Sequence, residues 1–375
     1  MVKINASLRN VFINITLFFT VLIICFIIGE IGVRLFKSNE LAPGLWPDEN
    51  ARFIPELKRD LYPNIHNMTR STSEFSYSIS TNSDGFRDFH SYEKGEDVYR
   101  IVGIGASSMF GNTVEVNDTY IAQLGDVLGT ETINLGVGGI GFGEMSYILR
   151  EYGLAYHPDL IIVEAEIGDL YADHQFDVRD SAVSSQSFFL WTYEHSKLVN
   201  HLYWKVKTTP LGYKLVSFLG LNKKGQDSNT FDLGFSNHED TALINHTMSL
   251  TTGYLKEMKE LADSKGIPMV VIFIPPTFQL NSDKYEQIAL EYGLDKSKFD
   301  VARAEHFFED ISHELDIPFF DSTSLLLNRS DVKYLDWQFD GHFNAHGNFV
   351  YATFLSRFLR DNHLINNNLI NGATK

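Results

Sequence analysis

The longest uninterrupted apolar stretch of the chain lies close to its N-terminus. Between Arg9 and Glu30 there are twenty residues without a charge. A helix rises about 1.5 Å per residue, so this stretch spans roughly 30 Å, the thickness of the hydrocarbon core of a bilayer. We therefore predict a membrane-spanning helix over residues 10–36, preceded by a tail of residues 1–9.

A cleaved signal peptide is the alternative interpretation of this stretch. Its apolar region is about 7–15 residues long and ends in small residues at the cleavage site. Here charged residues, Glu30 and Arg34, follow a longer stretch, which favours an uncleaved anchor. The flanking charges, Lys3 and Arg9 before the span and Arg34 and Lys37 after it, almost balance. We expect a single pass through the cell membrane, with the folded part extracytoplasmic, in the periplasm or at the cell surface.

Beyond the anchor, short and almost continuous apolar runs alternate with longer segments in which apolar residues recur at helical spacing. Such runs predict buried strands, and the segments between them predict helices. The alternation indicates a parallel sheet covered by helices on both faces. Strands are predicted at 100–105, 132–135, 159–163, 268–274 and 317–320, and helices after Asp118 and at 144–156, 242–265, 300–315 and 345–360.

Two segments depart from this alternation. Residues 37–97 contain spaced prolines and one strand-like stretch at 75–80, and we expect this lead-in segment to pack on the main domain, residues 98–362. Residues 174–240 interrupt the pattern and indicate an insertion over one edge of the sheet. Residues 363–375 are predicted to be a C-terminal tail. The insertion is rich in aromatic residues, which are more often core than ligand surface: Phe188, Phe189, Trp191, Tyr193, Tyr203 and Trp204.

Composition excludes several classes of function. The formal net charge of −17 argues against a nucleic-acid partner, because binding phosphates calls for clustered Lys and Arg. The single cysteine, Cys25, excludes a disulfide within the chain and a thiolate metal site. The glycines at 136–143 lack the spacing of a dinucleotide fingerprint, and no P-loop lysine follows them. We therefore expect no cofactor and no metal; the oligomeric state is not predicted.

Residues that could carry chemistry fall where predicted strands end, which is where open α/β sheets bind ligands. Ser107 follows the first strand, on a turn that can expose its hydroxyl. Glycine-rich residues 134–139 follow the second strand, and residues 167–170 follow the third. Asp340 and His342 are two apart in an extended segment and project to the same side, as a Ser-His-Asp triad requires. Taken singly, each signal is weak, since turns commonly contain Gly and Ser and the chain has thirteen histidines.

Together and in this order, the segments resemble the SGNH hydrolase superfamily, the GDSL-like lipases and acylhydrolases. The similarity covers roughly residues 77–359 apart from the insertion, and residues 82–87 resemble the segment before this domain in membrane-anchored bacterial members. It implies a flavodoxin-like three-layer α/β/α fold with a five-stranded parallel sheet. The resemblance is strongest at 100–107, 110–111, 117–120, 133–136, 158–160, 340–344 and Gly347.

By this resemblance Ser107 is the nucleophile, His342 the general base and Asp340 the acid that orients it, with Asp336 as the alternative acid. Two departures accompany the match. The usual Asp before the nucleophile is Ala106, and Asp and His are two positions apart, whereas many members place them three apart. The shorter spacing is also similar to related proteins that add acetyl groups to extracellular polysaccharide.

The resemblance also implies an oxyanion hole, in which one donor is missing. The donors would be the backbone N–H groups of Ser107 and Gly139 and the side chain of an Asn, but that Asn is replaced by Gly168. Loss of one oxyanion donor costs on the order of 10²–10³ in turnover. A neighbouring backbone N–H, Ser108 or Gln175 are the candidates to replace it.

Three functional hypotheses follow. The first and favoured one is a serine esterase on an acyl-ester substrate, such as the O-acetyl groups of an envelope polysaccharide. The second is an O-acetyltransferase that uses the same triad, with a sugar hydroxyl in place of water. The third, motivated by Gly168, is a catalytically degenerate glycan-binding or envelope-assembly protein. Labelling by a fluorophosphonate separates the third from the others, because only an activated serine reacts.

Overall fold

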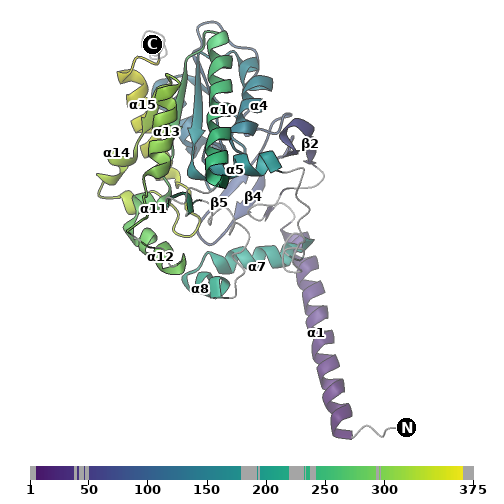
Figure 1. Ribbon diagram of the computed structural model, residues 1–375. Coiled ribbons are helices and arrows are strands. Elements are labelled where there is room, and N and C mark those ends of the chain that lie inside the picture. The colour runs from purple at the N-terminus through teal and green to yellow at the C-terminus, as the bar shows by residue number, and fades with distance from the viewer. Residues whose placement is uncertain are drawn as a thin grey trace.

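The computed structural model describes two parts, a long N-terminal helix and a globular α/β part (Figure 1). Helix α1 (Ala6–Phe36) includes a span, Asn10–Phe36, that is long and apolar enough to cross a membrane. The aromatic residues Phe188, Phe189, Trp191 and Tyr193 of the predicted insertion and residues 366–375 of the predicted tail lie outside the described residues. The described residues are 6–37, 40–41, 46, 50–178, 192, 195–218, 232, 234–236, 242–292, 295 and 297–365.

The globular part is built on a five-stranded parallel sheet, which confirms the predicted fold class. Its strand order is β10-β9-β8-β6-β7, so the chain reverses its direction of travel across the sheet between the adjacent strands β6 and β8. This is the flavodoxin-like order, in which ligands bind outside the carboxyl ends of the strands at that switch point. The strands are β6 (Arg100–Ile104), β7 (Glu131–Asn134), β8 (Leu160–Ala165), β9 (Met269–Phe273) and β10 (Phe319–Asp321).

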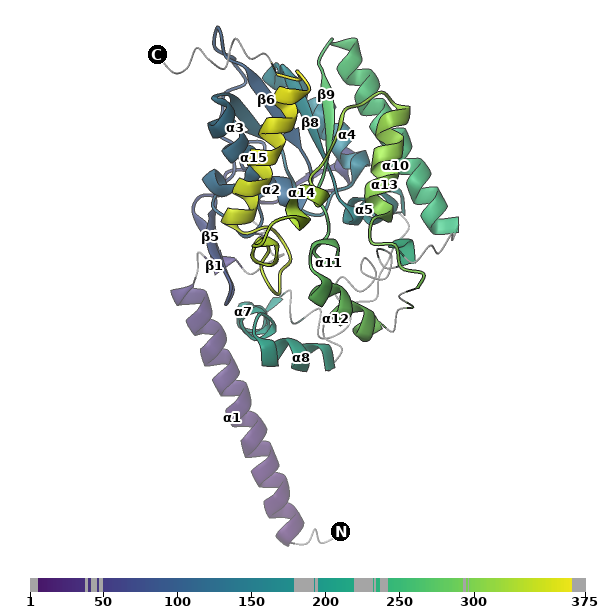
Figure 2. The ribbon, with the colours of Figure 1, turned by 90° about the vertical axis from the view of Figure 1, so that its left-hand side faces the viewer.

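Helices cover both faces of the sheet, and Figure 2 shows α3 and α15 together on one face. On the other face lie α4, α10 and α13 (Figure 1). The predicted helices are all present, although α4 ends earlier than expected. The α-helices of the globular part are α2 (Ser107–Phe110), α3 (Tyr120–Leu128), α4 (Phe142–Glu151), α5 (Ile167–Val178), α7 (Lys197–Lys207), α8 (Pro210–Phe218), α10 (Ala242–Ser264), α11 (Thr277–Leu280), α12 (Ser282–Tyr292), α13 (Arg303–Glu314), α14 (Thr323–Leu327) and α15 (Ala345–Asp361).

Short elements complete the fold before and between these helices. A three-stranded sheet contains the predicted strand at 75–80, and a two-stranded sheet lies between its first and second strands in the chain. Single 3-10 turns occur at Pro55–Leu57, Val116–Asp118, Gly153–Tyr156 and Val332–Tyr334. The strands are β1 (Glu40–Leu41), β4 (Met68–Ser71) and β5 (Ser76–Ile79) in the first sheet, and β2 (Arg52–Ile54) and β3 (Arg59–Leu61) in the second.

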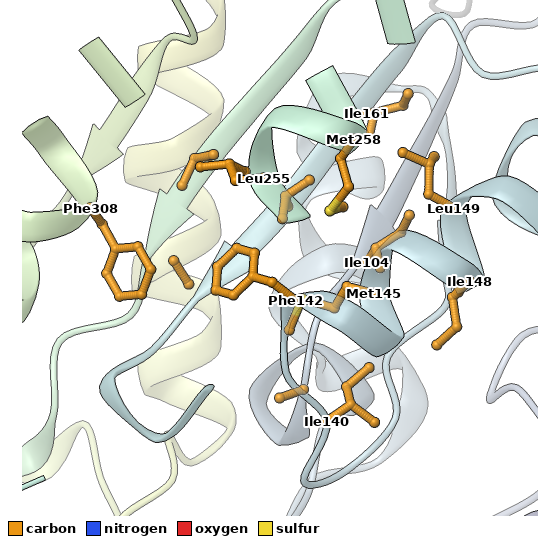
Figure 3. Packing of buried hydrophobic residues seen from close by; sticks show 14 of the residues in the cluster. Ile104, Ile140, Phe142, Met145, Ile148, Leu149, Ile161, Leu255, Met258 and Phe308 are labelled. Carbon is orange, nitrogen blue, oxygen red and sulfur yellow. The ribbon is translucent and has the colours of Figure 1, made fainter. Parts of the chain in front are cut away.

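The core on the α4 face explains why these apolar runs fold as they do. Fully buried side chains of α4 and α10 meet the strands there, and Phe142 stacks on Phe308 of α13 at 5.6 Å between ring centroids (Figure 3). Burying a side chain of this size contributes about 1.5–3 kcal/mol. Because helices pack on both faces of the sheet, the carboxyl ends of its strands are held in fixed positions.

The segment before the first sheet strand packs firmly on the rest of the globule. Arg87 is 1% exposed and donates hydrogen bonds to the carbonyls of Gly111 at 2.8 Å, Val114 at 2.9 Å and Ser78 at 2.7 Å. Burial lowers the pKa of the Arg87 guanidinium to about 10. The Asp88 carboxylate accepts the backbone N–H at the end of β7. These contacts hold β4 and β5 beside the loop that follows Ser107.

The turn after β7 approaches α2 so closely that only glycine fits at residue 136. A Cβ atom there would lie 2.2 Å from the backbone nitrogen of Phe110.

We expect Gly136→Ala to lower the free energy of unfolding by about 1–3 kcal/mol or more, the cost of overpacking. Gly253→Ala is the matched control, because its Cβ would meet nothing within 4 Å on the exposed side of α10. It should raise stability by up to about 1 kcal/mol. Urea unfolding of both variants tests this, and a Gly136→Ala protein as stable as the parent would contradict it.

Candidate active site

A buried carboxyl group fixes the turn that carries Ser107. Glu164 of β8 accepts the backbone N–H of Ala106 at 2.8 Å with one oxygen and the hydroxyl of Tyr120 with the other. Burial raises the pKa of Glu164 well above its usual range. A Cβ atom at Gly105 would lie 2.5 Å from the Cβ of Glu164, so the strand must end in glycine for the carboxyl to reach the turn. Ser107 therefore begins α2 in a fixed position.

The structure brings three of the predicted residues together at this turn. The Nε2 atom of His342 lies 2.8 Å from the Oγ atom of Ser107, although 235 positions separate the two residues. The Nδ1 atom of His342 is hydrogen-bonded to the carboxylate of Asp340. Because Nδ1 donates to a carboxylate, Nε2 is the nitrogen that can accept the serine proton. The order of contacts is that of a Ser-His-Asp triad.

The electrostatics of this pair favour an ionised carboxylate and a protonated imidazole. Burial alone would lower the pKa of His342, but the adjacent Asp340 carboxylate outweighs it, and the pKa rises to about 9. Burial opposes ionisation of Asp340 too, yet His342 holds the pKa of that carboxyl below its ordinary value. His342 therefore keeps its proton to a higher pH than an ordinary histidine.

The loop that carries Asp340 and His342 is held from two sides. The carboxylate of Glu74, in the turn between β4 and β5, accepts the backbone N–H of Phe339 at 3.0 Å and 3.1 Å. The backbone N–H of Trp337 donates to the carbonyl of His342 at 3.0 Å. The segment before the main domain thus supports the site directly, a role that no local sequence pattern indicates.

Asp336, the alternative acid, has a different place. It pairs with Phe343 through a β-bridge, and its carboxyl is bonded to the hydroxyl of Thr277. Burial raises the pKa of Asp336 to about 7. Among the described residues, Asp340 is the carboxylate bonded to the His342 ring, which favours Asp340 as the orienting acid.

A cavity of ≈ 430 Å³ opens beside His342 at the carboxyl edge of the sheet. Apolar side chains form much of its wall, and carboxyl groups are interspersed with them. Within the described residues there is no group of three or more His, Cys, Asp or Glu side chains that could hold a metal ion. The cavity is lined by Ser108, Glu166, Ile167, Gly168, Tyr213, Asp232, Ile274, Pro275, Pro276, Thr277, Phe278, Lys284, Ile288, Asp336, Phe339, Asp340, Gly341, His342 and Phe343.

The predicted oxyanion residues are divided between this cavity and its surroundings. Gly168 lines the cavity as the second residue of α5, and a Cβ atom there would meet nothing within 4 Å. Gly139 is not among the described residues that line it, and its carbonyl accepts a hydrogen bond from Arg59 at 3.0 Å. Its role as an oxyanion donor stays a prediction. Gln175 donates to the hydroxyl of Tyr171 at 3.0 Å and is likewise outside the lining.

Glu166 is the cavity residue that the sequence analysis missed. It precedes α5, and its backbone N–H donates to the carboxylate of Asp169 at 2.8 Å. Ser108 is bonded to its carboxyl group, while the other carboxyl oxygen has no partner within the described part of the chain. Burial raises the pKa of Glu166, and Ser108 and His342 oppose the shift. No local sequence pattern distinguishes Glu166, because an acidic residue after an apolar strand is ordinarily interpreted as the end of burial.

Several solved structures similar to this one are lipases and acylhydrolases of the GDSL type. A lipase/acylhydrolase from Enterococcus faecalis has 9% identity and a TM-score of 0.40, over 71% of this chain and 97% of that one. A GDSL-like lipase from Bacteroides thetaiotaomicron has 10% identity and a TM-score of 0.38, over 73% and 93%. A two-domain esterase active on acetylated mannans has 12% identity and a TM-score of 0.39, over 70% and 49%. No protein-family model matches the sequence, and none of the curated proteins is a significant match.

The contact between His342 and Asp340 predicts an alkaline titration of the imidazole. Because the carboxylate stabilises the protonated ring, His342 should lose its proton near pH 9, and Asp340→Asn should move that midpoint down. Ring-proton NMR over a pH series measures both, with the His342 signal identified by its loss in His342→Gln. A midpoint near pH 6.5, the ordinary value for histidine, in both proteins would contradict the assignment.

Proposed function

We propose that this chain is a serine ester hydrolase of the SGNH type, with Ser107 as nucleophile, His342 as general base and Asp340 as orienting acid. The observation that carries the proposal is the chain of hydrogen bonds from Ser107 to His342 to Asp340. This chain lies beside a cavity at the carboxyl edge of the sheet. Ser107 itself is not among the residues that line the cavity, but its partners His342 and Asp340 are.

The reaction follows from these positions. In the neutral form of His342, which becomes populated as the pH approaches its pKa of about 9, the Oγ atom of Ser107 attacks the ester carbonyl carbon while Nε2 takes the hydroxyl proton. The tetrahedral intermediate collapses, and the leaving alcohol oxygen receives that proton from Nε2. A water molecule then attacks the acyl group on Ser107, again giving its proton to Nε2, and the carboxylic acid leaves as the Ser107 oxygen is protonated. Asp340 stabilises the imidazolium in both halves.

The developing oxyanion would be held by backbone donors. Ser107 is the first residue of α2, so its N–H has no acceptor within that helix. Gly168 lies in the first turn of α5, whose N–H groups likewise have no acceptor within their own helix. Ser108 is bonded to Glu166, which makes its hydroxyl a weaker candidate than these N–H groups. We propose that the positive N-terminal ends of these two helices stabilise the oxyanion of the substrate carbonyl.

We propose O-acetyl groups of an envelope polysaccharide as the substrate class. In this proposal α1 anchors the protein in the membrane and the globular part is extracytoplasmic. The lead-in segment 37–97 and residues 98–362 fold together as that globular part. A cavity of ≈ 430 Å³ has room for a short acyl group beside part of a sugar. The missing asparagine at Gly168 is the observation that favours the other candidate, a non-catalytic glycan-binding or envelope-assembly protein.

Covalent labelling by a fluorophosphonate tests the nucleophile. The full chain should be labelled, and Ser107→Ala should lose the label and all esterase turnover while keeping its melting temperature. Ser108→Ala, on the same turn, is the matched control and should still be labelled. Labelling that persists in Ser107→Ala would overturn the assignment.

Acceptor dependence separates hydrolysis from transfer. With an acetylated glycan and water alone, a hydrolase should release free acetate at a rate that an added unacetylated glycan leaves unchanged. Acetate that appears only on an added glycan hydroxyl would instead show the O-acetyltransferase reaction on the same triad.

Gly168→Asn tests the missing oxyanion donor. A Cβ atom at this position meets nothing within 4 Å and the residue lines the cavity, so we expect an Asn side chain to extend into the cavity. It should raise turnover by up to about 10²–10³, the worth of one donor. Gly168→Ala is the matched control: it adds the same Cβ atom without a donor and should leave turnover close to that of the parent. An unchanged rate in Gly168→Asn would mean that the backbone donors already complete the hole. Absence of turnover in every form, together with no fluorophosphonate labelling, would support the non-catalytic candidate.

A further inference from the structure

Helices α7 and α8 differ in charge from the rest of this acidic protein. Residues 197–218 contain four lysines and no Asp or Glu, in a chain whose formal net charge is −17. The same segment contains Tyr203, Trp204 and Tyr213. Lys205 and Tyr213 turn toward the globular part, whereas Lys214 is exposed. An exposed lysine beside apolar residues is typical of helices that lie in the interface of a membrane.

Both helices also expose large apolar side chains at helical spacing. On α7, Leu202 and Val206 are 51% and 39% exposed, and on α8, Leu211 and Leu215 are 81% and 50% exposed. Residues four apart lie on one side of a helix, so each helix presents an apolar stripe outward. In a globular protein the stripe of a surface helix normally faces the core. The stripes of α7 and α8 are instead exposed, so an apolar partner outside the globular part is needed to cover them.

The start of α7 is bonded directly to Glu30, close to the C-terminal end of α1. The carboxylate of Glu30 accepts the hydroxyl of Ser196 at 2.8 Å and the backbone N–H groups of Lys197 at 3.2 Å and Leu198 at 2.9 Å. The Leu198 side chain packs against Gly29 of α1, where a Cβ atom would lie 2.9 Å from its Cδ2 atom. Glu30 thus satisfies N–H groups that the first turn of α7 leaves free.

The hydrogen bonds to Glu30 determine the depth at which α7 lies relative to a bilayer. The charge-free residues before Glu30 are long enough to fill the hydrocarbon core, so Glu30 lies where the core meets the headgroups. The start of α7, bonded to Glu30, lies at the same level. Figures 1 and 2 both show α7 and α8 beside the end of α1 that meets the globular part.

We infer that α7 and α8 form a membrane-interface hairpin, whose partner is the headgroup and upper acyl region of the bilayer that α1 crosses. The exposed leucines of α8 enter the acyl region, and Lys214, exposed between them, reaches the lipid phosphates. The inference rests on α1 as a membrane span and holds whether or not Ser107 is catalytic.

The hairpin is also tied to the candidate active site. Lys205 donates to the carbonyl of Thr72 at 2.8 Å, beside the turn that carries Glu74. Tyr213 of α8 lines the cavity, and its ring lies 5.8 Å from that of Phe339. The same short helix thus exposes leucines outward and contributes to the cavity wall, which places the cavity close to the lipid surface.

Site-directed spin labelling of the full chain in nanodiscs tests the inference. Single cysteines replace Leu211 and Leu215 in a Cys25→Ser background, and the lipid is phosphatidylcholine with phosphatidylglycerol. Lys265→Cys is the matched control, since Lys265 is exposed at the other end of the globule, after α10. Collision of the nitroxide with oxygen, which concentrates in lipid, is compared with collision with a water-soluble nickel complex.

At Leu211 and Leu215 the oxygen accessibility should exceed the nickel accessibility, with the reverse order at Lys265. Nickel accessibility as high as at Lys265 would show that the stripes face water and would overturn the inference. Low accessibility to both reagents would show that another part of this chain or a second copy covers them, which would overturn it equally.

Discussion

The hydrogen bond between Ser107 and His342 joins two residues that are 235 positions apart in the chain. Contacts on both sides hold the two residues where this bond can form. It needs a serine held at the end of a central strand and an imidazole held above that strand by a loop far along the chain. Glu164 holds the first through the turn before α2, and Glu74 holds the second through the backbone of Phe339. The parallel sheet supplies the common edge at which both supports meet.

The strands could be predicted because each depends on local pattern: apolar runs bounded by glycine, proline or charge fold as strands of a doubly covered sheet. Ser107 is singled out by its place after the first strand, but the proposed roles of Asp340 and His342 come from the resemblance to SGNH hydrolases, since the last strand, β10, already ends at Asp321. Glu164 and Glu166 could not be found in that way. Their pairing with Ala106, Tyr120 and Ser108 depends on which strands become neighbours, and a carboxylate at the end of an apolar run is ordinarily interpreted as the end of burial.

Helices α7 and α8 show a second limit of pattern analysis. Tyr203 and Trp204 indicated core packing, but the exposed stripes are formed by leucines and a valine, which in a soluble domain would be buried against the sheet. A stripe that faces a bilayer has the same spacing and composition, and only the contact of α7 with Glu30 of the anchor distinguishes the two. The proposed membrane contact, the cavity wall and the loop that carries Asp340 and His342 are then neighbours in one region, because α8 contacts Phe339 beside Asp340.

Trapping of an acyl-enzyme tests the central claim most directly, since an ester on one serine is the intermediate that a triad must form and that a binding protein cannot. The full chain is mixed with an activated acetate ester, quenched in acid and digested for mass spectrometry. The proposed mechanism predicts one acetyl group on Ser107, and its accumulation in His342→Gln should be lost or strongly slowed. Ester turnover without any acylated Ser107, or with the acetyl group on another residue, would contradict it.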